Sequence, residues 1–338
     1  MELVEVDPGH RTAVRDYAAA REAARRVDAP WLPPVTEHEV EGLLRHGWDL
    51  QPAVGQLAVA GGEVVGWADY ETSEYDNHHL AWLRFDVHPD HRRRGHGSEI
   101  LAALVSRARA EGRTSIGTDG WDHAAASAFA SAHGLECRSR EVLRRQVLSE
   151  LTWPEADRLH AESSSRADAY ELVRLDGPVP EGEIEAFARM VAVINDAPVD
   201  GLDVEDEVYS PRRIRAYEDA HRLRGIRIRR LYARHRDTGA LAGETIVAVD
   251  SMRPHRGEQH DTVVVRAHRG HRLGLLLKLE MLRWLREEEP QLRSIDTWNA
   301  ETNDHMIAVN EALGYRVMGR ALLFQKPLGG DGQGVGEP

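Results

Sequence analysis

Two segments of the sequence restrict the fold, because each joins an apolar run, a basic turn with glycine and a long amphipathic run. The first turn is VHPDHRRRGHG at residues 87–97, between LAWLRFDV and SEILAALVSRARAEG. The second is VRAHRGHRLG at residues 265–274, which continues the run TVVV and precedes LLLKLEMLRWLREEE. Each pattern predicts a strand, a tight turn and the start of a helix.

The glycine turn before each helix predicts an anion-binding loop. The first N–H groups of a helix have no partner inside it, and the helix dipole places partial positive charge at the same end. Glycine lets the backbone approach a ligand closely, and the arginines add charge. Both loops are therefore expected to bind a phosphate or a pyrophosphate.

The two loops also indicate a duplicated chain. Arg92 and Arg269 lie 177 residues apart in a chain of 338 residues, and the same order of expected strands and helices surrounds each. A repeat of this length indicates tandem domains and not a solenoid. We predict an N-terminal domain at 1–148, a linker at 149–168, a C-terminal domain at 169–328 and a disordered, glycine-rich tail at 329–338.

Composition argues against several kinds of partner. The net charge of -13 opposes nucleic-acid binding, which needs a basic face. No apolar run approaches the roughly 18 residues of a membrane span, and MELVEVDPGH lacks the basic and apolar regions of a secretion signal. The single cysteine, Cys137, fits a reducing compartment, so we expect a cytoplasmic protein.

Two histidine pairs have a spacing that metal ligands also use. His88 and His91 are three residues apart, as are His268 and His271. No carboxylate accompanies them as in the H-E-x-x-H motif. We predict no metal site and expect these imidazoles to face solvent or phosphate.

Read in order, the expected elements and both loops resemble a tandem protein of the GCN5-related N-acetyltransferase (GNAT) family. The loop of that family reads [Q/R]-x-x-G-x-[G/A]. Arg92, Gly95 and Gly97 match it fully, whereas the second copy has Arg272 in place of the first glycine. The stretch TWNAETNDHMIAVNEALGY at residues 297–315 resembles the closing motif of the family. The layout is also similar to that of mycothiol synthase.

The resemblance implies an α/β fold with two GNAT domains, each a mixed, splayed β-sheet flanked by helices. It implies that the loops bind the pyrophosphate of acetyl-CoA or another acyl-CoA. Asn299 would stand where the fifth strand of the domain splays from the fourth, and Asn303 would meet the cofactor from the next helix. The residues assigned to cofactor binding are Phe85, Asp86, Val87, Arg92, Arg93, Arg94, Gly95, His96, Gly97, Ser98, Val263, Val265, Arg269, Gly270, His271, Arg272, Leu273, Gly274, Asn299 and Asn303.

The two copies differ where the family often carries its general base, about nine to eleven positions before the loop arginine. In the second copy these positions hold His260, Gln259 and Glu258, and in the first they hold Leu83, Trp82 and Ala81. Glu258 and His260 are two residues apart and share one face of a strand. We predict that the C-terminal domain transfers the acyl group and that the N-terminal domain only binds it. An equally weighted interpretation is that Glu258 and His260 are only polar residues at the start of a strand.

The general acid is less evident. The family tyrosine lies four residues before the glycine that closes the helix, where the two copies hold Ala130 and Asn310. Asn310 can hydrogen-bond sulfur or substrate but cannot give up a proton, so the thiolate would leave unaided or via water, or a residue elsewhere would serve as the acid. Arg272 has two interpretations: its guanidinium caps the pyrophosphate, or its side chain costs affinity where only glycine fits.

These observations predict an acyl-CoA-dependent N-acyltransferase that acts on a small amine, with catalytic roles for Glu258, His260 and Asn310. The alternative from another class is a non-catalytic acyl-CoA-binding or scaffold protein with degenerate sites. The acidic run at residues 200–207 either attracts a cationic acceptor or is a solvated loop.

Overall fold

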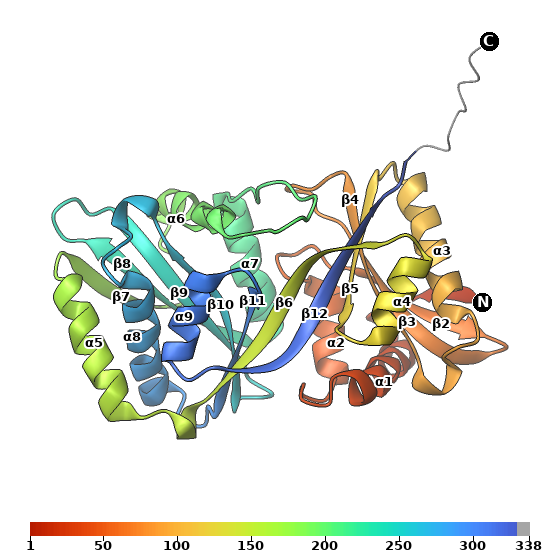
Figure 1. Ribbon diagram of the computed structural model, residues 1–338, viewed down its shortest axis with the longest axis horizontal. Coiled ribbons are helices and arrows are strands. Elements are labelled where there is room, and N and C mark those ends of the chain that lie inside the picture. Colours follow the sequence, from red (N-terminus) through yellow and green to blue (C-terminus); the bar gives the residue numbers. More distant parts are fainter. Residues whose placement is uncertain (330–338) are drawn as a thin grey trace, which may run out of the picture.

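A single mixed β-sheet runs through the computed structural model, which describes residues 1–329; the predicted disordered tail lies, beyond its first residue, outside the described residues. The sheet has 12 strands in the order β1-β2-β3-β4-β5-β12-β6-β11-β10-β9-β8-β7 (Figure 1). The first half, residues 1–148, supplies β1 (Glu2–Glu5), β2 (Val54–Ala60), β3 (Glu63–Glu71), β4 (Leu80–Val87), β5 (Ser115–Trp121) and β6 (Glu136–Val147). The second half, residues 149–329, supplies β7 (Tyr170–Asp176), β8 (Ile226–His235), β9 (Leu241–Asp250), β10 (Arg256–Val264), β11 (Ser294–Ala300) and β12 (Arg316–Pro327).

Helices cover both faces of the sheet, which confirms the predicted α/β class. In the first half they are α1 (Arg11–Asp28), α2 (Glu37–His46), α3 (His96–Ala110) and α4 (Ala124–Ala132). In the second half they are α5 (Trp153–Arg166), α6 (Ile184–Val191), α7 (Pro211–Leu223), α8 (Leu273–Glu288) and α9 (Asp304–Ala312). Neighbouring residues of one strand serve opposite faces, as Leu231 packs with α8 and Tyr232 packs with α6.

Local sequence signals set several of these boundaries. The side chain of Thr36 caps α2 by accepting a hydrogen bond from the backbone N–H of Glu39 at 3.2 Å, as its capping pattern predicts. Gly61 and Gly62 have φ of 60° and 84°, which the tight turn between β2 and β3 requires.

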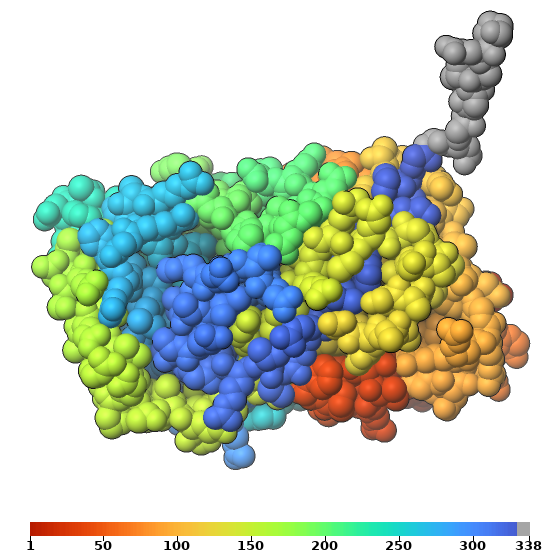
Figure 2. All heavy atoms as spheres, in the orientation of Figure 1, coloured from red at the N-terminus to blue at the C-terminus, as the bar shows by residue number. Residues whose placement is uncertain are grey.

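The last strand of each half lies inside the other half. β12 pairs antiparallel with β5 and with β6, and β6 pairs antiparallel with β12 and with β11. The two long strands run side by side through the middle of the molecule, and blue atoms of the C-terminal segment lie among the yellow atoms of the first half (Figures 1 and 2). The halves therefore share one continuous sheet where two separate sheets were expected.

The segment predicted as a linker, 149–168, is mostly helical. Helix α5 occupies Trp153–Arg166 and packs beside α8, with Ala156 and Leu159 in the same apolar cluster as Leu276. Pro154 stands in its first turn, where a missing N–H costs nothing. Three consecutive serines in the sequence suggested a linker, but Ser163 is fully buried in the structure.

The sheet opens in the middle of each half, as the predicted splay requires. β4 and β5 pair in parallel only over residues 80–83 and 115–118, and β10 and β11 only over 256–258 and 294–296. β10 also carries a bulge, since its register against β9 shifts between Gln259 and Thr262, whereas β4 pairs with β3 without a shift. No helix within residues 1–329 combines the length and apolar composition that crossing a membrane requires.

Candidate active site

The first predicted anion loop joins β4 to α3. Arg92 closes this turn, since its Nε donates to the carbonyl oxygen of Val87 at 3.0 Å. Arg93 and Gly95 have φ of 63° and 91°, in the left-handed region that lets the chain reverse tightly before the helix. Within the described residues, the backbone N–H groups of 93–97 make no hydrogen bond. Five donors in succession at a helix N-terminus fit a pyrophosphate group.

The second loop, between β10 and α8, repeats this geometry. The Nε of Arg269 donates to the carbonyl oxygen of Val264 at 3.0 Å, and Gly270 and Arg272 have φ of 89° and 57°. The backbone N–H groups of 270–274 also make no hydrogen bond in the described part of the chain. Arg272 thus adopts the left-handed conformation of Gly95 despite its side chain.

Each loop arginine is neutralised by an acid at the end of a helical segment in its own half. Nη1 and Nη2 of Arg92 both donate to the carboxylate of Asp28, at the end of α1. Arg269 binds Asp196 at 2.6 Å, and Arg266 binds the same carboxylate. The arginines therefore shape the turns, and the unbonded backbone N–H groups remain for an anion.

The side chain of Arg272 is tied to the neighbouring helix. Its Nη1 lies 3.2 Å from Oε2 of Glu162 on α5, and the ring of His271 contacts the carbonyl oxygen of Arg166 at 3.2 Å. In this arrangement the guanidinium is held by α5, so the interpretation in which it caps the pyrophosphate gains no support.

Glu258 and His260 lie together on one face of β10, as their spacing predicts. Oε2 of Glu258 is 3.9 Å from Nε2 of His260; the Glu258 side chain is 68% exposed and that of His260 is 7% exposed. The adjacent His260 lowers the pKa of Glu258 to about 2, so the carboxylate is ionised at neutral pH. β10 and β11 part directly after Glu258, so this pair stands where the sheet opens.

An aromatic cluster surrounds His260. The hydroxyl of Tyr217 on α7 is 2.6 Å from Nδ1 of His260. The centres of the His221 and His260 rings are 5.4 Å apart. Burial lowers the pKa of His221 to about 3 and raises the pKa of the Tyr217 phenol. The indole of Trp48 lies 4.6 Å from the His260 ring and remains 49% exposed, although it belongs to the first half. No pattern in the sequence indicated that Trp48 would lie beside His260.

The corresponding opening of the first half is filled differently. The Trp82 side chain lies over Gly117 on β5 and donates its indole N–H to Asp119 at 2.8 Å. Arg84 on the same strand also binds Asp119, at 3.1 Å. The first opening therefore differs from the second in two ways: β4 has no bulge, and the Trp82 indole occupies the opening.

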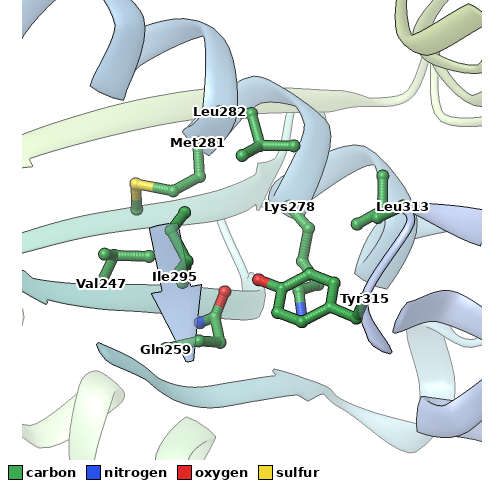
Figure 3. Close-up of a pocket in the computed structure, with 8 residues that line it drawn as sticks. All are labelled: Val247, Gln259, Lys278, Met281, Leu282, Ile295, Leu313 and Tyr315. Carbon is green, nitrogen blue, oxygen red and sulfur yellow. The ribbon is translucent and has the colours of Figure 1, made fainter. Parts of the chain in front are cut away.

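Asn310 lies on the other side of the second opening and is completely buried. Its Oδ1 accepts a hydrogen bond from Nζ of Lys278 at 2.6 Å, and its Nδ2 donates to Oδ1 of Asn299 at 2.7 Å. Lys278 faces Gln259 and the ring of Tyr315 within a narrow pocket (Figure 3). Residue type and helical period alone did not single out this lysine.

The remaining predicted cofactor residues occupy varied positions. Phe85 packs against Phe129, and the hydroxyl of Ser98 is 2.9 Å from Nε2 of His133. Asn303 caps α9 by accepting a hydrogen bond from the backbone N–H of Met306. Across residues 1–329, no three His, Cys, Asp or Glu side chains converge on a point where a metal ion could sit.

The acidic run at 200–207 packs between the halves. Asp200 accepts hydrogen bonds from Ser139 at 2.6 Å and Thr302 at 2.5 Å, while Glu205 and Asn77 exchange hydrogen bonds. Several of these carboxylates therefore form contacts between the halves. Neither interpretation drawn from the sequence, an attraction for a cationic acceptor or a solvated loop, describes such contacts.

The fold and both loops define the class of protein, and comparisons with known proteins agree. The family described as "Acetyltransferase (GNAT) family" matches residues 15–135. A tandem GNAT protein from the clavulanic acid biosynthesis pathway aligns over 98% of this chain and 99% of its own, with a TM-score of 0.79 and 26% identity. Residues 15–135 therefore match the GNAT family, and the whole chain is similar in fold to a tandem GNAT protein.

Two curated relatives are mycothiol acetyltransferases. That of Stackebrandtia nassauensis is 35% identical over 99 residues, and that of Amycolatopsis mediterranei is 41% identical over 103 residues. Each match covers 29% of this chain, and the matched segments span only 31% and 32% of the relatives. A GCN5-related N-acetyltransferase from Sphaerobacter thermophilus shares the fold, with a TM-score of 0.65 and 17% identity over 96% of this chain and 95% of its own.

Proposed function

We propose that this protein is an acyl-CoA-dependent N-acyltransferase that acts on a small amine. Transfer takes place in the second half, and the first half holds an acyl-CoA without reacting it. The observation that carries the proposal is the position of Glu258 and His260 at the point where β10 leaves β11. At the matching opening of the first half, the Trp82 side chain cannot accept a proton, and the nearby carboxylate of Asp119 is bound by Trp82 and Arg84.

The side chains around the second opening divide the work of the reaction. The bound acyl-CoA supplies the acyl group as a thioester. The Glu258–His260 pair takes the proton that the acceptor ammonium loses: Glu258 is ionised and attracts the ammonium, and Tyr217 fixes the imidazole through Nδ1. As the nitrogen–carbon bond forms, the carbon–sulfur bond breaks; the nitrogen gives its second proton to a water molecule, and the departing thiolate takes a proton from that water. Trp48 forms the wall against which the acceptor binds.

The names of the relatives suggest the donor and the type of acceptor. Both curated relatives are called mycothiol acetyltransferases, which favours acetyl-CoA as the donor and a small-molecule amine as the acceptor. The unbonded backbone N–H groups of 93–97 in the first half, and of 270–274 in the second, would hold the pyrophosphate of acetyl-CoA.

One observation favours the alternative of a non-catalytic acyl-CoA-binding protein. The ion pair between Arg272 and Glu162 ties the second loop to helix α5, whereas the intact loop motif of the first half has Gly95 at this position, which cannot form such an ion pair. A second loop that binds no CoA would leave only this alternative.

Mass spectrometry under non-denaturing conditions, combined with turnover assays, tests the proposal. We expect one CoA retained on purification and a second bound on titration with acetyl-CoA. Glu258→Gln and His260→Gln should reduce turnover about 100-fold or more while both CoA molecules still bind. Trp82→Phe is the matched control in the first half and should leave turnover unchanged. Full turnover in Glu258→Gln/His260→Gln would overturn the assignment of the second half.

A further inference from the structure

Lys278 is a buried basic residue in a chain that uses arginine at almost every other such position. It is one of two lysines among 338 residues, and it is 2% exposed on α8. Its neighbours in the narrow pocket are Val247, Gln259, Met281, Leu282, Ile295, Leu313 and Tyr315 (Figure 3). Burying an ammonium group among such side chains is costly unless its hydrogen bonds are used.

The ammonium has a single polar partner within the described residues. Nζ donates to Oδ1 of Asn310 at 2.6 Å and lies 4.9 Å from the centre of the Tyr315 ring. It forms no ion pair with any carboxylate in the described part of the chain. Its interactions therefore converge on one amide oxygen and one aromatic face.

This contact fixes the direction of a hydrogen-bond chain. A protonated lysine can only donate, so the oxygen of Asn310 must face it and the NH₂ group must face the other way. That NH₂ group donates to Oδ1 of Asn299 at 2.7 Å. The oxygen of Asn299 is thereby occupied, and its own NH₂ group is left at the end of β11 where β10 has already diverged.

We propose that Lys278 is a positioning residue that sets the polarity of the Asn310–Asn299 pair, so that Asn299 offers N–H donors to a carbonyl oxygen of the acyl-CoA bound in the second opening. The inference rests on the proposed function, and it places hydrogen-bond donors of Asn299 in the wall of the second opening. An amide or thioester carbonyl is the group that such a wall recognises.

The first half has no equivalent chain. Counted from the last glycine of each loop, the counterpart of Lys278 is Leu101, and the residue four before the helix-closing Gly134 is Ala130. Both are buried apolar side chains. The first site therefore serves as an internal reference for the second in any measurement on the whole protein.

The protonation state of Lys278 gives a readout that a purely structural residue would lack. Burial lowers the pKa of Lys278 to about 7. Among the side chains that line the pocket, Tyr315 is the other titratable group, and burial raises the pKa of its phenol. A neutral amine can also accept a hydrogen bond, so loss of the proton releases the fixed direction of the chain.

Calorimetric titration of the whole protein with CoA between pH 6 and pH 8.5 tests the inference. Second-site affinity should fall as pH rises through about 7, relative to the first site. Lys278→Met should weaken the second site by about tenfold and remove this pH dependence. Lys278→Met/Asn310→Ala should bind no more weakly than either single variant, because both residues act through one chain. Met281→Leu, in the same pocket, should change neither site.

Two results would overturn the inference. The first is a ratio of second-site to first-site affinity that does not vary with pH in the wild-type protein. The second is a double variant, Lys278→Met/Asn310→Ala, whose loss of second-site affinity equals the sum of the losses in the two single variants. The wild-type titration needs no variant to fold. Normal CoA binding at both sites without turnover would reject the proposed function and leave the role of Lys278 standing.

Discussion

Arg145 and Asp296 join the two halves of the chain through a two-pronged ion pair. Nε and Nη2 of Arg145 on β6 lie 2.6 Å and 2.9 Å from the two carboxylate oxygens of Asp296 on β11. Arg256 binds the same carboxylate, and Asp296 is 4% exposed. The strand of one half is thus anchored beside the fifth strand of the other by a shared buried acid.

Asp296→Ala should destabilise the protein by about 3–5 kcal/mol, because it leaves Arg145 and Arg256 partly buried without a counter-ion. Urea denaturation followed by far-UV circular dichroism measures this loss as a lower midpoint. Glu301→Ala, which removes only the exposed pair with Arg320, is the control and should cost less than about 1 kcal/mol. An unchanged midpoint in Asp296→Ala would show that the pair contributes little to stability.

The exchange of β6 and β12 predicts that the halves reassemble after being separated. Residues 1–148 carrying an affinity tag should co-purify with residues 149–338 when both are expressed in one cell, because each fragment completes the sheet of the other. A second fragment ending at residue 315 lacks β12 and should not co-purify. Monomeric, stably folded 1–148 alone would contradict the prediction.

Trp48 should control the affinity for the acceptor. Trp48→Ala removes the indole beside His260 and is expected to lower kcat/KM for the amine about tenfold, while KM for the acyl-CoA stays unchanged. Trp48→Phe retains an aromatic ring and should keep most of the activity. Equal effects on both substrates would mean that Trp48 supports the fold and not the acceptor.

Lys278 should make stability depend on pH. Burial lowers its pKa to about 7 from an ordinary value of 10.5, so between these values the unfolded chain binds more protons than the folded one. Stability therefore rises with pH across this window, by about 1.4 kcal/mol per unit at most, and the cost of the buried charge is full below it. Relative to the wild type, Lys278→Met should be more stable at pH 6 and should lose that advantage towards pH 10. A difference that stays constant with pH would contradict the prediction.

Much of the secondary structure, and the resemblance to the GNAT family, could be predicted from the sequence. The Thr36 cap, the Gly61–Gly62 turn and the glycine loops at 87–97 and 265–274 are local signals, and local backbone geometry follows from them. The spacing of Glu258 and His260 also placed them correctly on one strand face. Their catalytic roles, and the binding roles of the loop residues, stay predictions.

Other features depend on contacts between residues far apart in the sequence. The bulge in β10 turns His260 towards Tyr217, while Trp48 comes from a turn more than half the chain away. The segment 149–168 was predicted as a linker because of its serine run, Pro154 and mixed charges, but most of it forms helix α5, which packs against α8.

The sequence by itself determined the strand–loop–helix units, because these rest on periodicity and on glycine conformations within a few residues, and its motifs carried the resemblance to the GNAT family. Only the tertiary structure decided that β6 and β12 change places, that Trp48 joins the second site and that Lys278 is buried against Asn310. Strand pairing is specified by edges and buried surfaces that form only when the whole chain folds, and no local pattern records which edge a strand will meet.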